Sequence, residues 1–351
     1  NCVNNGTITG TSSNTGGIIG SLGTTTAVVT SCQNFGEVNG VKYVGGIYGY
    51  AVAESDAGST MTGCVNSGAI TGAQYTGGLA GFVKFNSAQT TGTLKLSDSY
   101  NTASVSGKSA SLTDEGYIGG LVGCAESHSS AEDGIKEVVL ENCYNTGSVA
   151  AGDVFSNVGG LIGYAYTSNM YPDIVVRYCY NAGSVSGGTQ VGGLIGAVSA
   201  LGNLGPDVVF IGYVTITNCY SAAPSVAASD IDGIAGTGIG QISVCDSADF
   251  FTISNVFVRE YDNGPGTIGE DSAGIDGSDI VSLTGAQMAE ESFITLLGGA
   301  FAKWSNDIYG EDSPDYDEDM YNAYAALYGS YGYPVLLELC GGTAVTTYNV
   351  K

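Results

Sequence analysis

Basic residues are scarce in this chain, and their scarcity narrows the partners that it can have. Nine Lys and Arg residues stand against 34 Asp and Glu residues, which gives a formal net charge of -25 over 351 residues. The sequence has no basic stripe that could neutralise phosphates, so nucleic-acid binding is excluded on electrostatic grounds. An anionic membrane surface would repel the chain for the same reason.

Three further absences argue against a zinc site, a Ser-His-Asp catalytic site and a membrane-spanning helix. The chain has one histidine, His128, and no Cys-x-x-Cys pair, so a zinc site would lack its usual ligands. No nucleophile elbow accompanies His128, so we expect a solvated loop histidine and no Ser-His-Asp catalysis. No apolar run approaches the ~20 residues of a membrane-spanning helix, so we expect no membrane insertion.

What the chain has in abundance is a repeat. The pattern Cys-Tyr-Asn-x-Gly-x-Val, followed after a short gap by Gly-Gly-Leu-x-Gly, recurs about seven times, and residues 179–196 are a clear copy. The cysteine column consists of Cys2, Cys32, Cys64, Cys143, Cys179, Cys219 and Cys245, with Ser99 in one copy. The Gly-Gly column begins at Gly16, Gly45, Gly77, Gly119, Gly159 and Gly192. Such an array predicts a solenoid, whose core grows with the number of coils.

The segments between these columns have the pattern of short β-strands. Val214-Thr215-Ile216-Thr217, for example, alternates apolar and polar residues before a cysteine. Each repeat is expected to carry about three short strands, bounded by Gly, Asn or Ser turns. Strands that recur once per coil predict an all-β protein, a right-handed parallel β-helix of about seven coils. We assign residues 1–245 to this β-helix.

The nine cysteines favour a ladder of buried thiols over a disulfide set. Seven of them share one column, where neighbours lie one coil apart with parallel side chains. That spacing is within disulfide range, but the Cβ vectors do not converge well. Ser99 fills the column in one copy, which a required bridge partner would not tolerate. Isolated disulfides remain an alternative to the thiol ladder.

The repeat resembles a known family. Asn145–Val149 and Gly159–Tyr164 resemble the GLUG motif of bacterial cell-surface proteins, and the resemblance covers residues 1 to about 240. It implies an extracellular or cell-wall-displayed protein, often a large adhesin-like polypeptide. Some relatives carry the repeat beside an immunoglobulin-cleaving metallopeptidase domain, whose His-Glu-x-x-His is absent here. The motif is structural, so the resemblance brings no catalytic residues with it.

The repeat fades from Asp246 onward. One helix is predicted near 284–297, with Thr284 as its N-cap and Gln287 completing a capping box. Gly298 is expected to end it. The order of these elements looks like the closing segment often found after GLUG arrays. We therefore assign residues 246–351 to a small α+β cap, which would cover apolar columns and unpaired backbone at the end of the β-helix.

Two sets of residues are candidates for ligand contact. Tyr100, Tyr144, Tyr180 and Tyr220 follow the cysteine column in four consecutive copies. Successive strand residues face opposite sides, so inward cysteines would place these tyrosines outward, as an aromatic strip for sugar rings or a protein partner. A corner just before the cysteine would instead make the tyrosines part of the core.

The second set is acidic. Asp312, Asp315, Asp317 and Asp319 lie in one short segment. This segment is either a solvated loop or a weak calcium site. It is not an EF-hand, because Met320 stands where the loop needs glycine and Ala326 where it needs glutamate. No other cofactor is expected.

These features favour a non-enzymatic extracellular module that acts as an adhesin, stalk or structural spacer. Its partner would be a glycan or protein of a host or neighbouring cell. One alternative is a subunit of a self-assembling extracellular fibre, whose coils associate end to end. Another is a glycan-binding or carbohydrate-active β-helix, although hydrolysis would require two carboxylates that converge on one face.

Overall fold

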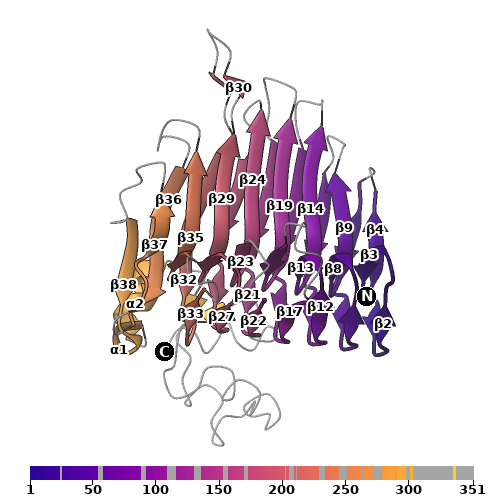
Figure 1. Ribbon diagram of the computed structural model, residues 1–351, viewed down its shortest axis with the longest axis horizontal. Coiled ribbons are helices and arrows are strands. Elements are labelled where there is room, and N and C mark those ends of the chain that lie inside the picture. Colours follow the sequence, from indigo (N-terminus) through magenta and orange to yellow (C-terminus); the bar gives the residue numbers. More distant parts are fainter. Residues whose placement is uncertain are drawn as a thin grey trace, which may run out of the picture.

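The computed structural model describes residues 1–23, 26–53, 58–87, 92–108, 116–129, 136–152, 157–169, 173–201, 203–204, 209–210, 212–228, 234–244, 251–261, 264–271, 279–288, 290–297, 301–302 and 335–336. In these residues the chain is a solenoid of parallel strands, and each strand pairs with its counterparts in the neighbouring coils (Figure 1). The predicted parallel β-helix is thereby confirmed. At ~4.8 Å per strand, seven coils give a rod of roughly 34 Å.

Each coil contains five strand positions, which form five parallel ladders along the rod. Ladder 1, directly after the cysteine column, consists of β1 (Val3–Asn4), β6 (Gln33–Asn34), β11 (Val65–Asn66), β16 (Tyr100–Asn101), β21 (Tyr144–Asn145), β26 (Tyr180–Asn181) and the end of β32 (Tyr213–Ser221). Ladder 2 consists of β2 (Ile8–Thr9), β7 (Val38–Asn39), β12 (Ile70–Gly72), β17 (Val105–Gly107), β22 (Val149–Ala150), β27 (Val185–Ser186) and β33 (Val226–Ala227).

The third ladder ends at the first glycine of each Gly-Gly pair, and the fourth follows the pair. Ladder 3 consists of β3 (Ser13–Gly16), β8 (Lys42–Gly45), β13 (Gln74–Gly77), β18 (Tyr117–Gly119), β23 (Asn157–Gly159), β28 (Gln190–Gly192) and β34 (Ile234–Gly236). Ladder 4 consists of β4 (Ile19–Leu22), β9 (Tyr48–Ala53), β14 (Ala80–Ser87), β19 (Val122–Ser129), β24 (Ile162–Asn169), β29 (Ile195–Leu201), β35 (Ile239–Val244) and β37 (Ile268–Asp271).

The fifth ladder leads back to the cysteine column. It consists of β5 (Val28–Thr30), β10 (Ser59–Thr62), β15 (Gly92–Ser97), β20 (Lys136–Glu141), β25 (Asp173–Arg177), the start of β32, and β36 (Phe251–Arg259). The sequence indicated about three strands per repeat, which is wrong by two. Strands of two or three residues, as in ladders 1 and 2, are too short to show a period of two, so the sequence pattern underestimates the number of strands.

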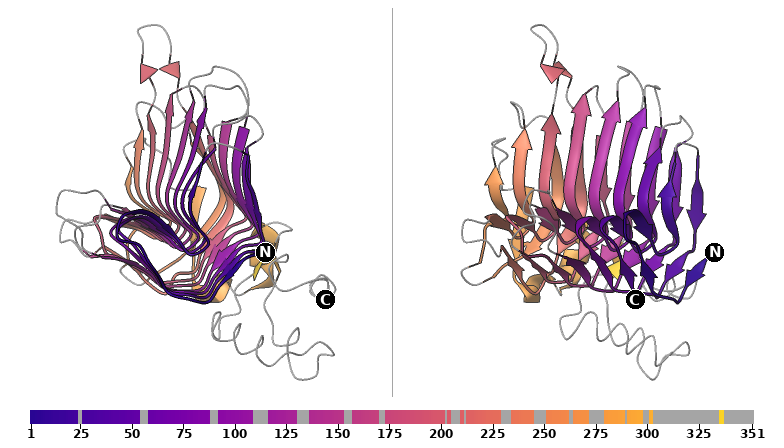
Figure 2. Two further views of the ribbon diagram at one scale, coloured as in Figure 1. Left: turned by 90° about the vertical axis from the view of Figure 1, so that its right-hand side faces the viewer. Right: turned by 45° about the vertical axis from the view of Figure 1, so that its right-hand side comes forward.

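Two apolar cores run along the rod. The larger core lies between ladders 4 and 5 and also contains the buried cysteines, among them Cys64, Cys143 and Cys179. The smaller core, which includes Val38 and Val44, is formed by ladders 2 and 3. The view down the rod in Figure 2 shows the two corresponding lobes of each coil, with the strands of successive coils stacked behind one another.

An asparagine column lies at the waist between the two cores. Asn34, Asn66, Asn101, Asn145 and Asn181 are fully buried. The Gly-Gly column packs against them: a Cβ on Gly160 would lie 2.3 Å from Asn181 Nδ2 and 2.1 Å from the carbonyl of Gly193. Glycine is required at this position because the backbones of neighbouring coils and the amide side chains meet there.

The coils continue beyond the expected boundary at residue 245. β36 pairs in parallel with β32, β37 with β35, and β38 (Ile280–Leu283) with β36. Val256 of β36 takes the place next to Cys219 in the cysteine column. The assignment of Cys245 to that column was therefore wrong, and Cys245 itself lies outside the described residues.

Two short helices follow the last strand of the array. α1 (Gly285–Met288) and α2 (Glu291–Leu297) replace the single helix expected near 284–297. The capping box is present: the amide of Thr284 donates to Gln287 Oε1 at 2.9 Å, and the amide of Gln287 donates to Thr284 Oγ1 at 3.2 Å. Two antiparallel pairs complete the described elements: β30 (Asn203–Leu204) with β31 (Val209–Phe210), and β39 (Phe301–Ala302) with β40 (Val335–Leu336).

Candidate functional site

The four tyrosines singled out from the sequence form one continuous stack. Strand pairing puts Tyr100, Tyr144, Tyr180 and Tyr220 in register on neighbouring coils. Their ring centroids are 4.6, 4.9 and 4.9 Å apart, and adjacent ring planes differ by 8° or less. The coil spacing alone produces this geometry, because it is the distance between paired strands.

The stack is not the exposed strip that the sequence suggested. Tyr144, Tyr180 and Tyr220 are at most 3 % exposed, and Tyr100 is half-buried. Phe293 of α2 packs edge-on against Tyr220, at a centroid distance of 5.7 Å. The exposed-strip interpretation is therefore wrong for three of the four rings, and the buried alternative is correct for them.

A corner does fall just before the cysteine column. The residue at this corner has a positive φ of 51–53° in six coils, at Ser31, Asp98, Asn142, Tyr178, Asn218 and Asn255. Cysteine and asparagine, on either side of the tyrosine, both point to the inside of the coil. The tyrosine therefore lies on the other face of the strand, where α2 packs against the last ring.

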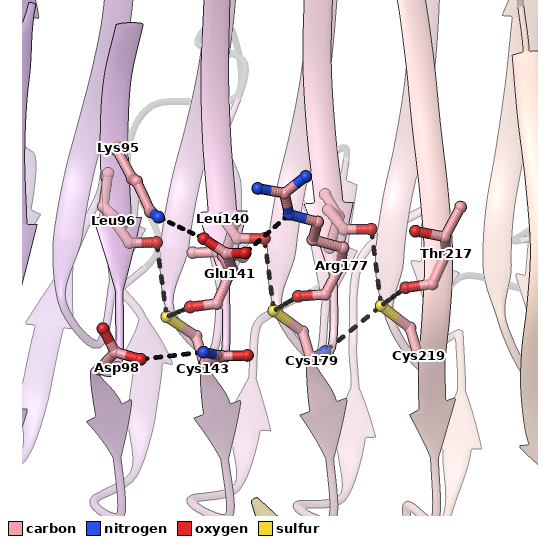
Figure 3. A network of polar contacts seen from close by, with 12 residues as sticks. Lys95, Leu96, Asp98, Leu140, Glu141, Cys143, Arg177, Cys179, Thr217 and Cys219 are labelled. Carbon is pink, nitrogen blue, oxygen red and sulfur yellow. Dashed lines mark hydrogen bonds and ion pairs between the residues drawn. The ribbon is translucent and has the colours of Figure 1, made fainter. Parts of the chain in front are cut away.

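The cysteine column is a ladder of free thiols, as expected (Figure 3). Cys179 Sγ donates to the carbonyls of Arg177 at 3.2 Å and Leu140 at 3.5 Å. Cys143 and Cys219 make the equivalent pairs of contacts. Burial raises the pKa of Cys64 to about 11 and that of Cys179 well above its usual value. Buried thiols with raised pKa values are poor nucleophiles and poor metal ligands.

One carboxylate lies between two cations outside this column (Figure 3). Glu141 Oε1 accepts from Arg177 Nε at 2.9 Å, and Glu141 Oε2 pairs with Lys95. Partial burial raises the pKa of Glu141, but the hydrogen bonds from Lys95 and Arg177 outweigh it, so the pKa is lowered overall. A general acid needs a raised pKa instead. The neighbouring Asp98 accepts from Asn142 Nδ2 at 3.0 Å, which suits a structural role.

His128 is not the loop residue that the sequence indicated. It lies on β19, half-buried, with its Nδ1 2.8 Å from Ser168 Oγ of the next coil. Burial and the nearby Lys84 lower its pKa. This pairing links two coils on the outer face of ladder 4.

The calcium prediction stays a prediction, because Asp312, Asp315, Asp317 and Asp319 lie outside the described residues. Within the residues that the structure describes, no group of three or more His, Cys, Asp or Glu side chains is arranged to hold a metal ion. In the same part of the chain, no helix is long and apolar enough to cross a membrane.

A second aromatic cluster was not predicted from the sequence. It contains Tyr43, Tyr50, Tyr75, Phe82, Tyr117 and Tyr164. A signal was present in the sequence: Tyr43, Tyr75 and Tyr117 each lie two residues before a Gly-Gly pair, and the other three lie a few residues after one. Aromatic residues occupy those places in only three copies each, and Cys124 interrupts the second column between Phe82 and Tyr164, so they do not stand out as part of the repeat.

Comparison with protein-family models, with curated proteins and with solved structures finds no match for this chain.

Proposed function

We propose that this chain is a stiff, non-enzymatic segment of an extracellular bacterial surface protein, where it serves as a stalk or spacer. The observation that carries the proposal is the asparagine column, because it ties consecutive coils together from inside. Each amide from Asn34 to Asn145 donates to the glycine or alanine carbonyl two residues on and to the Oδ1 of the next asparagine. The latter distances are 2.7 Å for Asn34–Asn66, Asn66–Asn101 and Asn101–Asn145, and 2.9 Å for Asn145–Asn181.

This arrangement supports stiffness for an electrostatic reason. A buried amide that loses its partner bears the full desolvation cost, about 1–3 kcal/mol. Bending or sliding one coil against the next would break an internal amide bond together with the backbone bonds of five ladders. The coils therefore resist deformation as a unit, which is what a spacer needs.

Single-molecule force spectroscopy tests this proposal. A stiff spacer is expected to hold its length until coils peel off in discrete steps. One coil between Asn145 and Asn181 contains 36 residues, so a step would release about 120 Å of extended chain. Continuous lengthening at low force would contradict the proposal. The Asn145→Ala variant is the matched comparison and should release its coil at lower force.

A further inference from the structure

Six aromatic side chains gather where each coil bends between ladders 3 and 4. Tyr43, Tyr75 and Tyr117 come from consecutive strands of ladder 3, and Tyr50, Phe82 and Tyr164 come from ladder 4. We call this set the bend patch. Neighbouring centroids lie close together: 4.9 Å for Tyr43–Tyr75, 5.1 Å for Tyr75–Tyr117 and 4.8 Å for Tyr117–Tyr164. The rings thus form one surface that follows the rod axis.

The bend patch lies on the outer face of the coil. Val44 and Val83, the chain neighbours of Tyr43 and Phe82, belong to the two inner cores, so the aromatic side chains point the other way. Tyr43, Tyr50, Tyr75 and Tyr164 are half-buried, which leaves part of each ring accessible to solvent. Phe82 and Tyr117 lie deeper, at 7 % and 8 % exposure.

The patch is confined to four coils. On the coil before Tyr50 the paired residue is Ser21, and on the coil after Tyr164 the paired residue is Ala197. Asn157 follows Tyr117 in the same way. A surface that is bounded by small and polar residues has the length of a short oligomer, about three strand spacings or ~14 Å.

Two of these tyrosines have an unusual backbone conformation. Tyr43 has a φ of 54° and Tyr75 a φ of 51°, a region that bulky residues rarely adopt. The preceding coil has Asn14 at this place, with a φ of 65°, and asparagine tolerates the conformation well. Tyr43 and Tyr75 therefore occupy places that asparagine would fit with less strain.

Hydrogen-bonding groups border the aromatic surface on the same face of ladder 4. Lys84, Glu126 and Tyr166 lie in one register row, two residues beyond Phe82, Cys124 and Tyr164. Lys84 Nζ is 2.5 Å from Glu126 Oε1, so the row contains a balanced charge pair. On the other side, Lys42 Nζ lies 4.9 Å from the centroid of Tyr43 and 5.4 Å from that of Tyr75.

We propose that the bend patch binds an uncharged oligosaccharide that lies along the rod axis. Sugar rings present apolar faces for stacking on aromatic rings and hydroxyl groups for a bordering polar row, so both parts of this surface are used. The net charge of -25 repels polyanionic glycans. A proline-rich peptide would use the rings but has little to offer the Lys84–Glu126 row.

This inference goes beyond the stalk or spacer role, which needs no ligand, and the two can fail separately. The test is an array of neutral hexasaccharides of the cellulose, xylan, mannan and chitin types, with calorimetric titration of those that bind. A deca-proline peptide is titrated in parallel. We expect at least one neutral glycan to bind, and Tyr75→Ala or Tyr50→Ala to weaken its binding about tenfold.

Three variants make the result specific. Tyr75→Phe keeps the ring and should retain binding within about threefold. Tyr213→Ala removes an exposed tyrosine on ladder 5 and should leave binding unchanged. Glu126→Gln alters only the polar row and should weaken binding even if the alanine variants fold poorly. The proposal is overturned if no neutral glycan binds, if binding survives both alanine substitutions in folded protein, or if only the proline peptide binds.

Discussion

At the scale of single residues, the buried asparagine has hydrogen-bond partners in both neighbouring coils. Asn145 Nδ2 donates to the Gly147 carbonyl at 2.8 Å and to Asn181 Oδ1 at 2.9 Å, while its own Oδ1 accepts from Asn101 at 2.7 Å. Each coil thus satisfies the amide of the next one. A fully satisfied buried polar network rigidifies a core, whereas a broken one destabilises it.

Replacing Asn145 with alanine should therefore lower the free energy of unfolding by about 2–4 kcal/mol, since it removes three hydrogen bonds and leaves a cavity. Urea titration measures this change. Asn4→Ala is the matched control, because Asn4 occupies the same column at the first coil, is half-buried and has one asparagine neighbour. Equal losses for the two variants would argue against a ladder that acts through both neighbours.

The thiols make stability depend on pH. The pKa of Cys64 is raised from 9.0 to about 11 by burial, so above pH 9 the unfolded chain loses this proton before the folded chain does. The folded state then binds more protons, and the free energy of unfolding falls as pH rises from 9 to 11. Urea midpoints at pH 8 and pH 10 measure the slope. Cys64→Ala should make it shallower, and an unchanged slope would contradict this assignment.

At the scale of the strand and the turn, much of the coil could be predicted. The Gly-Gly and cysteine columns indicated which residues pair in successive coils. A glycine such as Gly160 marks this register because the structure leaves no room for a side chain there. The break between α1 and α2 and the continuation of the coils past residue 245 could not be predicted in this way. β36 alternates in burial but has valine at the cysteine position, so it follows the coil without carrying the motif.

The candidate site was predicted less well than the coil. The stacked tyrosines were found by their position after the cysteine, but Phe293 of α2, which packs against the last ring, Tyr220, was not. That residue lies far from them in the sequence, and no local pattern connects the two. The bend patch was missed for a similar reason, since its two columns become neighbours only where the coil bends.

The Gly-Gly turn gives a test at this scale. Gly160→Ala would place a Cβ 2.1 Å from the Gly193 carbonyl, so the coil must shift or separate. We expect a loss of at least about 3 kcal/mol, or a chain that does not fold, measured by thermal unfolding. Gly152→Ala is the control, because nothing lies within 4 Å of its added Cβ. A mild effect at Gly160 would show that the waist is looser than these contacts indicate.

At the scale of the whole molecule, charge opposes compactness. Thirty-four acidic residues against nine basic ones repel one another across the surface, while Lys84–Glu126 and Lys95–Glu141–Arg177 offset only a small part of this. Salt weakens both effects, but these partly exposed ion pairs are few against 34 acidic residues, so the loss of repulsion should dominate.

Raising NaCl from 10 to 200 mM should therefore increase the melting temperature by roughly 2–4 °C, as expected for about 1 kcal/mol. Differential scanning calorimetry measures the shift. Sucrose of equal osmolality serves as the control, since it does not screen charge. A melting temperature that falls with salt would mean that the ion pairs outweigh the repulsion.

The asparagine column also gives the rod an electrical direction. From Asn4 to Asn145 every amide donates to the asparagine of the next coil, and the series ends at Asn181, which donates to the Gly193 carbonyl. The side-chain dipoles add, with their negative pole at the first coil, in an interior that screens them weakly. Two rods that met through their first coils would bring the two negative poles together. The asparagine column therefore disfavours head-to-head pairing and favours a common polarity in any assembly.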